Sequence, residues 1–185
     1  KRYKRDHPTP IVLNGATEND YVAVFSQIYK ENHWHTGSGP GSNPENAAPY
    51  MVVLQQYFDD PRFNSIVDLG CGDWQIMRNI RIPPNKTYLG FDVAPMVIDA
   101  NTAEYKKENV RFYHSNGLHE FAELKISGDL LIVKDVLQHW PHSEIEFFIK
   151  EIIKEKIILT QVLRETLWDN IRNGQTRSEE RRVGK

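Results

Sequence analysis

Two short acidic segments that follow one another in the chain have the residue types to hold a small polar ligand. The first, residues 65–74 (SIVDLGCGDW), is an apolar run that leads into a turn with Gly70 and Gly72. The second, residues 87–92 (TYLGFD), ends in the carboxylate of Asp92. Glycines let a ligand approach the backbone where a Cβ would collide, and an acid at the tip of the next strand can accept both ribose hydroxyls. The spacing therefore predicts a site for a nucleoside-containing cofactor.

The charge and glycine spacing of this turn argue against a pyrophosphate ligand. A dinucleotide-binding turn, G-x-G-x-x-G, would need a third glycine where this chain has Gln75, and that glycine allows close packing of helix on strand. Asp68 and Asp73 flank the glycines, and their charges would repel a pyrophosphate but attract a cation. The turn therefore favours a cationic ligand without phosphates. A strand-to-helix turn with no ligand is the alternative, because short glycine motifs also occur without one.

S-adenosylmethionine (SAM) is such a ligand, since it carries a sulfonium, an ammonium and a ribose but no phosphate. At Asp68, Gly70 and Gly72 the chain resembles class I SAM-dependent methyltransferases, whose first motif reads hydrophobic-Asp-x-Gly-x-Gly. The resemblance covers roughly residues 20–176. It implies a Rossmann-like fold, SAM as the cofactor, and methyl transfer to an N or O nucleophile. Two alternatives stay open: a SAM-binding module without turnover, and a nucleotide-dependent oxidoreductase, against which the acidic turn argues.

The resemblance also implies roles for individual residues. Asp92 matches the acid that binds the ribose, and Asn116 stands where the family commonly has an Asp that contacts the adenine amino group. Asp135 and His139 are the candidates for acid–base catalysis, with a solvated histidine ahead of Pro141 as the alternative. The implied cofactor-binding set is Asp68, Gly70, Cys71, Gly72, Asp73, Trp74, Asp92, Val93, Asn116, Gly117, Lys134 and Gly37.

Alternating strands and helices are expected to position these residues. Strands are predicted at 65–69, 87–92, 110–114, 129–134 and 156–162. Such alternation implies a mostly parallel sheet with helices on both faces, and ligands in such sheets bind at the carboxyl ends of the strands. The predicted fold class is therefore α/β with a Rossmann-like sheet.

Three amphipathic helices are predicted from apolar spacing. The first begins after a Thr17 N-cap and has the apolar face Tyr21, Val24, Phe25, Ile28 and Tyr29. The second begins near Pro49 and ends before residue 59. The third follows the fourth strand, begins with a capping box of Ser143 and Glu146, and has the stripe Ile145, Phe148, Ile149, Ile152 and Ile153.

A glycine-rich segment, residues 33–42 (HWHTGSGPGS), lies between the first two helices. Its glycine turns could offer backbone N–H groups to the carboxylate of SAM, and Trp34 could cover the ligand. We therefore predict a lid here, with a flexible linker as the alternative. For Trp34 and Trp74, packing in the core or in the lid is an alternative hypothesis of equal standing to contact with the ligand.

Composition narrows the class of protein. A length of 185 residues suits one domain, and a net charge of −2 gives no bulk attraction to nucleic acid or to a membrane. Cys71 is the single cysteine, so a disulfide framework is excluded, and the histidines show no metal-ligand spacing. No apolar run is long enough to span a bilayer. We expect a cytoplasmic enzyme whose methyl acceptor is a small molecule or a protein side chain.

The expected organisation has three parts. Residues 1–16 form a basic arm, residues 17–176 a methyltransferase domain, and residues 177–185 a charged, non-native tail. Within the domain, residues 17–62 supply helices and lid and residues 63–176 the sheet. Sheets of the family end with two further strands after the fifth, and the tail lacks strand periodicity, so the expectation is a chain truncated at its C-terminus.

Overall fold

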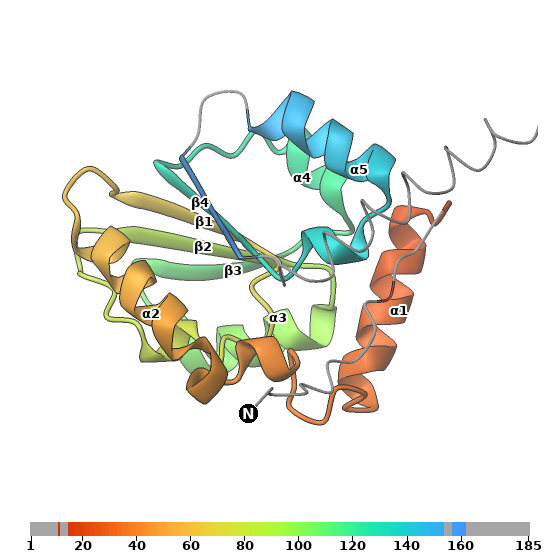
Figure 1. Ribbon diagram of the computed structural model, residues 1–185, viewed down its shortest axis with the longest axis horizontal. Helices are drawn as coiled ribbons and strands as arrows, with labels where there is room; N and C mark the ends of the chain where they lie inside the picture. The colour runs from red at the N-terminus through yellow and green to blue at the C-terminus, as the bar shows by residue number, and fades with distance from the viewer. Residues whose placement is uncertain (1–10, 12–14, 154–156, 162–185) are drawn as a thin grey trace, which may run out of the picture.

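A computed structural model of the chain describes residues 11, 15–153 and 157–161 and is shown in Figure 1. Its centre is a five-stranded sheet in the order β3-β2-β1-β4-β5, in which every neighbouring pair is parallel. The strands are β1 (Ser65–Leu69), β2 (Thr87–Asp92), β3 (Val110–His114), β4 (Leu130–Lys134) and β5 (Ile157–Gln161). The predicted Rossmann-like α/β class is confirmed, and the strand bounds agree with the prediction within one residue.

Apolar residues alternate between the two faces of the central strands, and each face is covered by helices (Figure 1). On one face Ile66 and Ile132 pack with Leu54 and Phe58 of α2 (Pro44–Asp59), next to α3 (Pro95–Tyr105). On the other face the partners of the sheet are α4 (Leu118–Glu123), α5 (His142–Phe147) and the π-helical turn η4 (Phe148–Ile152). Successive strand residues point to opposite faces, so continuous apolar runs in β1 and β4 produce a sheet that is buried on both sides.

The edge at the carboxyl ends of the strands is flanked by α1 (Glu18–Lys30), which stands across this edge in Figure 1. The predicted N-terminal cap is present, because the Asp20 carboxylate accepts hydrogen bonds from the backbone N–H and the hydroxyl of Thr17, both at 2.7 Å. The segment after α1 returns to this edge through the 3-10 turn Pro40–Ser42 and continues into α2. Both segments therefore lie where the predicted ligand site has to be.

Helix α2 begins five residues earlier than predicted, at Pro44 instead of Pro49. The start signal is Asn43, whose side-chain oxygen accepts a hydrogen bond from Glu45 N at 2.9 Å, followed by a proline at the first helical position. Pro49 lies inside the helix. The predicted start at Pro49 is wrong because the Asn43 cap places the first helical residue at Pro44.

The helix after β4 also differs from the prediction. Its N-cap is Pro141, so the predicted capping box of Ser143 and Glu146 is wrong. The chain then makes a π turn, in which Ile153 N donates to Phe148 O at 3.2 Å across five residues. A π turn takes more residues than an α turn and rotates the following side chains. As a result Phe148 and Ile152 are buried, whereas Ile149, from the predicted buried stripe, is 55% exposed.

Parts of the predicted organisation lie outside the described residues. These are most of the arm 1–16, the end of the domain at 162–176 and the tail 177–185. Among the helices that the structure does describe, none combines the length and the apolar character that crossing a bilayer requires.

Candidate functional site

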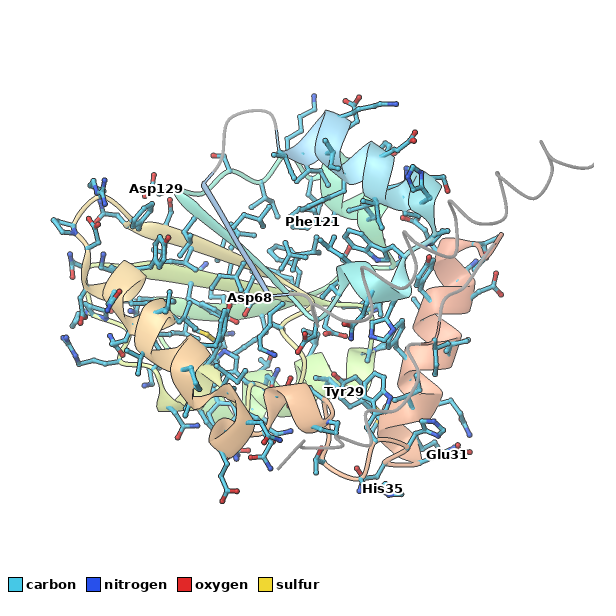
Figure 2. All side chains as sticks on the ribbon, in the orientation of Figure 1. Tyr29, Glu31, His35, Asp68, Phe121 and Asp129 are labelled. Carbon is cyan, nitrogen blue, oxygen red and sulfur yellow. The ribbon has the colours of Figure 1, made fainter. Side chains whose placement is uncertain are left out.

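A cavity of about 450 Å³ lies at the carboxyl ends of β1, β2 and β4. Its walls come from the turn after β1, the residues after β4, the loop before α2, and one side of α1. Figure 2 shows Asp68 at the middle of the sheet and Tyr29 on the side of α1 that faces the sheet. The cavity is therefore the place where the sequence pattern put a ligand.

The turn after β1 is a tight bend that only glycine fits at two positions. Gly70 and Gly72 have φ values of +81° and +56°, a region that L-residues with a side chain rarely adopt. A Cβ at Gly70 would lie 2.3 Å from Val136 Cγ2, and a Cβ at Gly72 would lie 2.3 Å from Ser38 Oγ. The turn is thus closely packed on its neighbours while its backbone lines the cavity.

Asp92, at the end of β2, holds this turn in place. One of its carboxylate oxygens accepts from Gly72 N at 2.9 Å and the other from Ala94 N at 3.0 Å. The side chain is buried, and burial raises the pKa of its carboxyl above the ordinary value. Each oxygen can still accept a second hydrogen bond, and Asp92 lines the cavity. It can therefore brace the turn and contact a ligand at the same time.

Asp68 occupies a different environment. Its carboxylate is fully buried in the sheet and accepts a hydrogen bond from Tyr88 Oη at 2.7 Å. Burial, opposed by this hydrogen bond, raises the pKa of Asp68 to about 7. A substantial fraction of Asp68 is therefore neutral near neutral pH, so its charge contributes less to ligand binding than the sequence pattern suggests.

The loop before α2 is attached to the glycine turn through Ser38. Its hydroxyl donates to Asp73 Oδ1 at 2.7 Å and accepts from Asp73 N at 2.9 Å, and its backbone N–H donates to Asp73 Oδ2 at 3.2 Å. At the other end of the loop, Lys134 Nζ donates to Gly41 O at 2.9 Å. The predicted lid segment thus lies on the cavity and is held at both ends.

The residues after β4 form the opposite wall. Asp135 has a φ of +56°, and one of its oxygens forms an ion pair with Lys134 while the other, buried Oδ1, has no partner among the described residues. His139 is buried, so the reading of it as a solvated residue is wrong. Its Nδ1 lies 3.1 Å from Ile11 O. Because a carbonyl oxygen only accepts, Nδ1 carries the proton and Nε2 is an acceptor, 3.4 Å from Gln138 Nε2. Burial lowers the pKa of His139.

Three residues of the predicted cofactor-binding set are not part of the cavity wall: Trp74, Asn116 and Gly37. The Trp74 ring packs in the core, 4.7 Å from the Tyr105 ring, because a φ of +60° turns its side chain away from the cavity. The backbone and side-chain N–H groups of Asn116 donate to Glu120 Oε2. The other nine residues of that set line the cavity, as do Asp135 and His139.

Helix α1 contributes residues that the sequence pattern assigned only to a core-facing stripe. Tyr21, Phe25 and Tyr29 line the cavity, together with Trp34. The Phe25 ring lies 5.3 Å from the His139 ring, and the Trp34 ring lies 5.9 Å from it. The feature of the sequence that could have indicated this wall is the number of aromatic residues on the apolar face of α1. In the described part of the chain, no group of three or more His, Cys, Asp or Glu side chains is arranged to hold a metal ion.

Comparisons with known proteins agree with this architecture. A family model described as an O-methyltransferase domain matches residues 18–177. The DhpI–SAH complex superposes with a TM-score of 0.55 at 12% identity, over 77% of this chain and 67% of that one. N-methyltransferase NodS from Bradyrhizobium japonicum WM9, solved with S-adenosyl-L-homocysteine (SAH), superposes with a TM-score of 0.53 at 15% identity, over 77% and 72%.

Other matched structures are longer than the shared region. The chain covers 64% of the methyltransferase domain of bacterial CtHen1-CN, at a TM-score of 0.49 and 13% identity over 61% of this chain. At these identities the structural likeness shows the fold alone. No curated protein sequence is similar enough to this chain to count as a match. Since the family model spans most of the sequence, the chain belongs to the O-methyltransferase domain family, in agreement with the resemblance to methyltransferases that its sequence indicates.

Proposed function

We propose that the protein is a SAM-dependent methyltransferase that transfers a methyl group to an N or O nucleophile. The observation that carries the proposal is the turn at Gly70 and Gly72, braced by Asp92 at the carboxyl edge of a parallel sheet. Membership of the O-methyltransferase domain family supports the reaction type. Two proteins of the same fold, NodS and DhpI, were solved in complex with SAH, which supports the choice of cofactor.

The chemistry of the cavity fits SAM. A Cβ at Gly70 would meet Val136 Cγ2 and a Cβ at Gly72 would meet Ser38 Oγ, so the two glycines let both cavity walls pack directly against the backbone of the turn. Asp92 and Asp73 line the cavity, and the one lysine among the described wall residues, Lys134, pairs with Asp135 instead. This arrangement suits a ligand that carries a sulfonium and an ammonium. Asp92 keeps lone pairs for ribose hydroxyls.

Each wall of the cavity would have its own task. When bound, SAM supplies a methyl group on a sulfonium sulfur that is already activated for displacement. The glycine turn and Asp92 would hold and orient the nucleoside, and Trp34 would exclude water. Asp135 and His139, on the wall after β4, would face the acceptor, where Nε2 of His139 is able to take up a proton.

Ligand binding should raise the thermal stability. If SAH binds with micromolar affinity, about −8 kcal/mol, ligand at about 100 times its Kd should stabilise the fold by about 2.7 kcal/mol. For a domain of this size the melting temperature should rise by about 5 to 10 °C. Differential scanning calorimetry with SAH, and with NAD as the control ligand, checks this. A shift with NAD and none with SAH would refute the proposed cofactor. Turnover of labelled SAM then separates an enzyme from a SAM-binding module.

The loop before α2 should act as a lid over the cofactor. Hydrogen exchange across residues 33–43 should slow when SAH binds, because Ser38 and the backbone around it are attached to the turn that contacts the ligand. Mass spectrometry of exchange measures it, with α3 as the control region. Ser38→Ala, which removes both side-chain hydrogen bonds to Asp73, should speed exchange in the same segment. Equal exchange with and without SAH would mean that the segment is only a linker.

A further inference from the structure

Four buried polar atoms on the cavity wall lack a hydrogen-bond partner in the described residues: Tyr21 Oη, Tyr50 Oη, Asp135 Oδ1 and Gln138 Oε1. Buried polar groups are normally satisfied, and an orphan carboxylate or amide oxygen is costly. Asp135 Oδ1 and Gln138 Oε1 only accept hydrogen bonds. A ligand that completes this wall must therefore carry N–H or O–H groups that point toward the residues after β4.

The charge of the cavity indicates whether the N–H or O–H groups of the ligand belong to a cation, a neutral group or an anion. Among the described residues, six acidic side chains line it: Asp68, a substantial fraction of which is neutral, and Glu18, Asp73, Asp92, Asp135 and Glu144. Lys134 is the only lysine among the wall residues that the structure describes, and it already contacts the Asp135 carboxylate and donates to Gly41 O. His139 directs its Nδ1 proton to Ile11 O, and burial lowers the pKa of this histidine. Such a cavity attracts a cation and repels an anion.

An aromatic surface lies beside the unpartnered oxygens. Phe25, Trp34 and His139 are in mutual ring contact, at centroid distances of 5.3 to 6.2 Å, and Trp140 lines the cavity after them. Faces of aromatic rings stabilise organic cations, and indole does so most strongly. The same surface offers apolar contact to a ring-bearing ligand.

The sheet order separates this wall from the proposed cofactor wall. Strand β2, which ends at Asp92, and strand β4, which precedes Asp135, lie on opposite sides of β1. The glycine turn after β1 lies between them. A nucleoside held by Asp92 therefore leaves the β4 wall for a second ligand.

We infer that the methyl acceptor is a ring-bearing amine that binds at the β4 wall as an ammonium ion, with its N–H groups donating to Asp135 Oδ1 and Gln138 Oε1. This rests on the proposed function, which leaves the N or O nucleophile open. It assigns Asp135 to the binding of the acceptor cation, with His139 beside it as the proton acceptor.

The step balances for an amine. The ammonium nitrogen first gives one proton to His139 Nε2, and the nearby Asp135 carboxylate stabilises the imidazolium that forms; this transfer frees the lone pair of the amine nitrogen. That lone pair forms a bond to the methyl carbon, and the carbon–sulfur bond breaks with its electron pair left on the sulfur as a neutral thioether. The product is the methylated ammonium ion, which Asp135 can still hold by a remaining N–H, and His139 returns its proton to solvent.

Three probes with the same ring test the acceptor class: phenethylamine, 2-phenylethanol and phenylacetate. Calorimetric titration of each, with and without saturating SAH, should show phenethylamine binding at least about tenfold more tightly than the other two, because only the ammonium can form an ion pair with Asp135 in addition to a hydrogen bond. Asp135→Asn should weaken phenethylamine binding at least about tenfold and leave 2-phenylethanol within about threefold.

The control variant is Asp99→Asn on α3, an exposed carboxylate outside the cavity, which should bind all three probes as the unaltered protein does. Retained SAH affinity in Asp135→Asn shows that the variant is folded. Equal or tighter binding of 2-phenylethanol or phenylacetate, or no binding of any probe, would overturn the amine assignment. A failure of SAH to bind would instead refute the proposed cofactor, and the amine preference is still read from the titrations without SAH.

Discussion

Gly70→Ala should abolish measurable SAH binding and destabilise the fold. At a φ of +81° an alanine is strained by about 1 to 2 kcal/mol, and its Cβ would lie 2.3 Å from Val136 Cγ2, which adds about 1 to 3 kcal/mol of overpacking. Val136 is next to Asp135 and lines the cavity, so any shift that relieves the clash also changes the ligand site. We expect SAH affinity to fall by at least about 100-fold, measured by calorimetry.

Two further variants separate the causes of this loss. Gly15→Ala introduces a Cβ at a similar φ, +74°, with nothing within 4 Å, so it measures backbone strain alone. Gly70→Ala combined with Val136→Ala removes the clashing methyl and leaves Val136 Cβ, 3.6 Å away, as the nearest atom of that residue. If the double variant regains SAH binding, the clash was the cause; if it regains only stability, the new Cβ blocks the ligand. Full affinity in Gly70→Ala would contradict the assigned site.

Asp92→Ala should weaken SAH binding by about 1 to 3 kcal/mol, because ribose hydroxyls lose a charged acceptor. The same change should lower the free energy of unfolding by about 1 to 3 kcal/mol, since the buried N–H groups of Gly72 and Ala94 lose their partner. The sequence alone does not indicate this effect on stability, because it cannot show that both carboxylate oxygens are used within the fold.

Calorimetry and urea titration read the two effects of Asp92→Ala separately. Asp92→Asn is the matched variant: it keeps one oxygen for a backbone N–H but turns an amide NH₂ toward the second, so its unfolding free energy should fall between the other two. Asp99→Ala on the exposed side of α3 serves as the control. If SAH affinity is unchanged while stability drops, Asp92 only braces the turn.

The parts of the fold that could be read from the sequence are those that a repeating local pattern determines. Continuous apolar runs identified the central strands β1 and β4, because a strand buried on both faces needs such a run. The start of α2 was predicted at the wrong proline. Asn43 caps the helix directly before Pro44, whereas Pro49 lies inside the helix. The π turn at Phe148–Ile152 has no comparable periodic signal.

The candidate site could be predicted only as far as chain position fixes side-chain direction. Asp92, Gly70 and Gly72 line the cavity because they lie at the carboxyl ends of strands, where the direction of the chain is fixed by the sheet. Trp74 is next to them in sequence, yet its positive φ directs the ring into the core. Tyr21 and Phe25 were predicted on a core-facing helix stripe, but they line the cavity. An amphipathic stripe predicts that a helix face is covered, but not whether packing or a ligand covers it.

The left-handed backbone at Asp135 restricts which mutations this position can accept during evolution. At a φ of +56°, glycine and asparagine are tolerated with aspartate, whereas most larger residues are strained. Asparagine and glycine are also one nucleotide away from either aspartate codon. A descendant of this protein could therefore lose the negative charge at this point in a single step and without rebuilding the turn. Glutamate, although it keeps the charge, would require the backbone to change, so the position is freer to change its charge than its size.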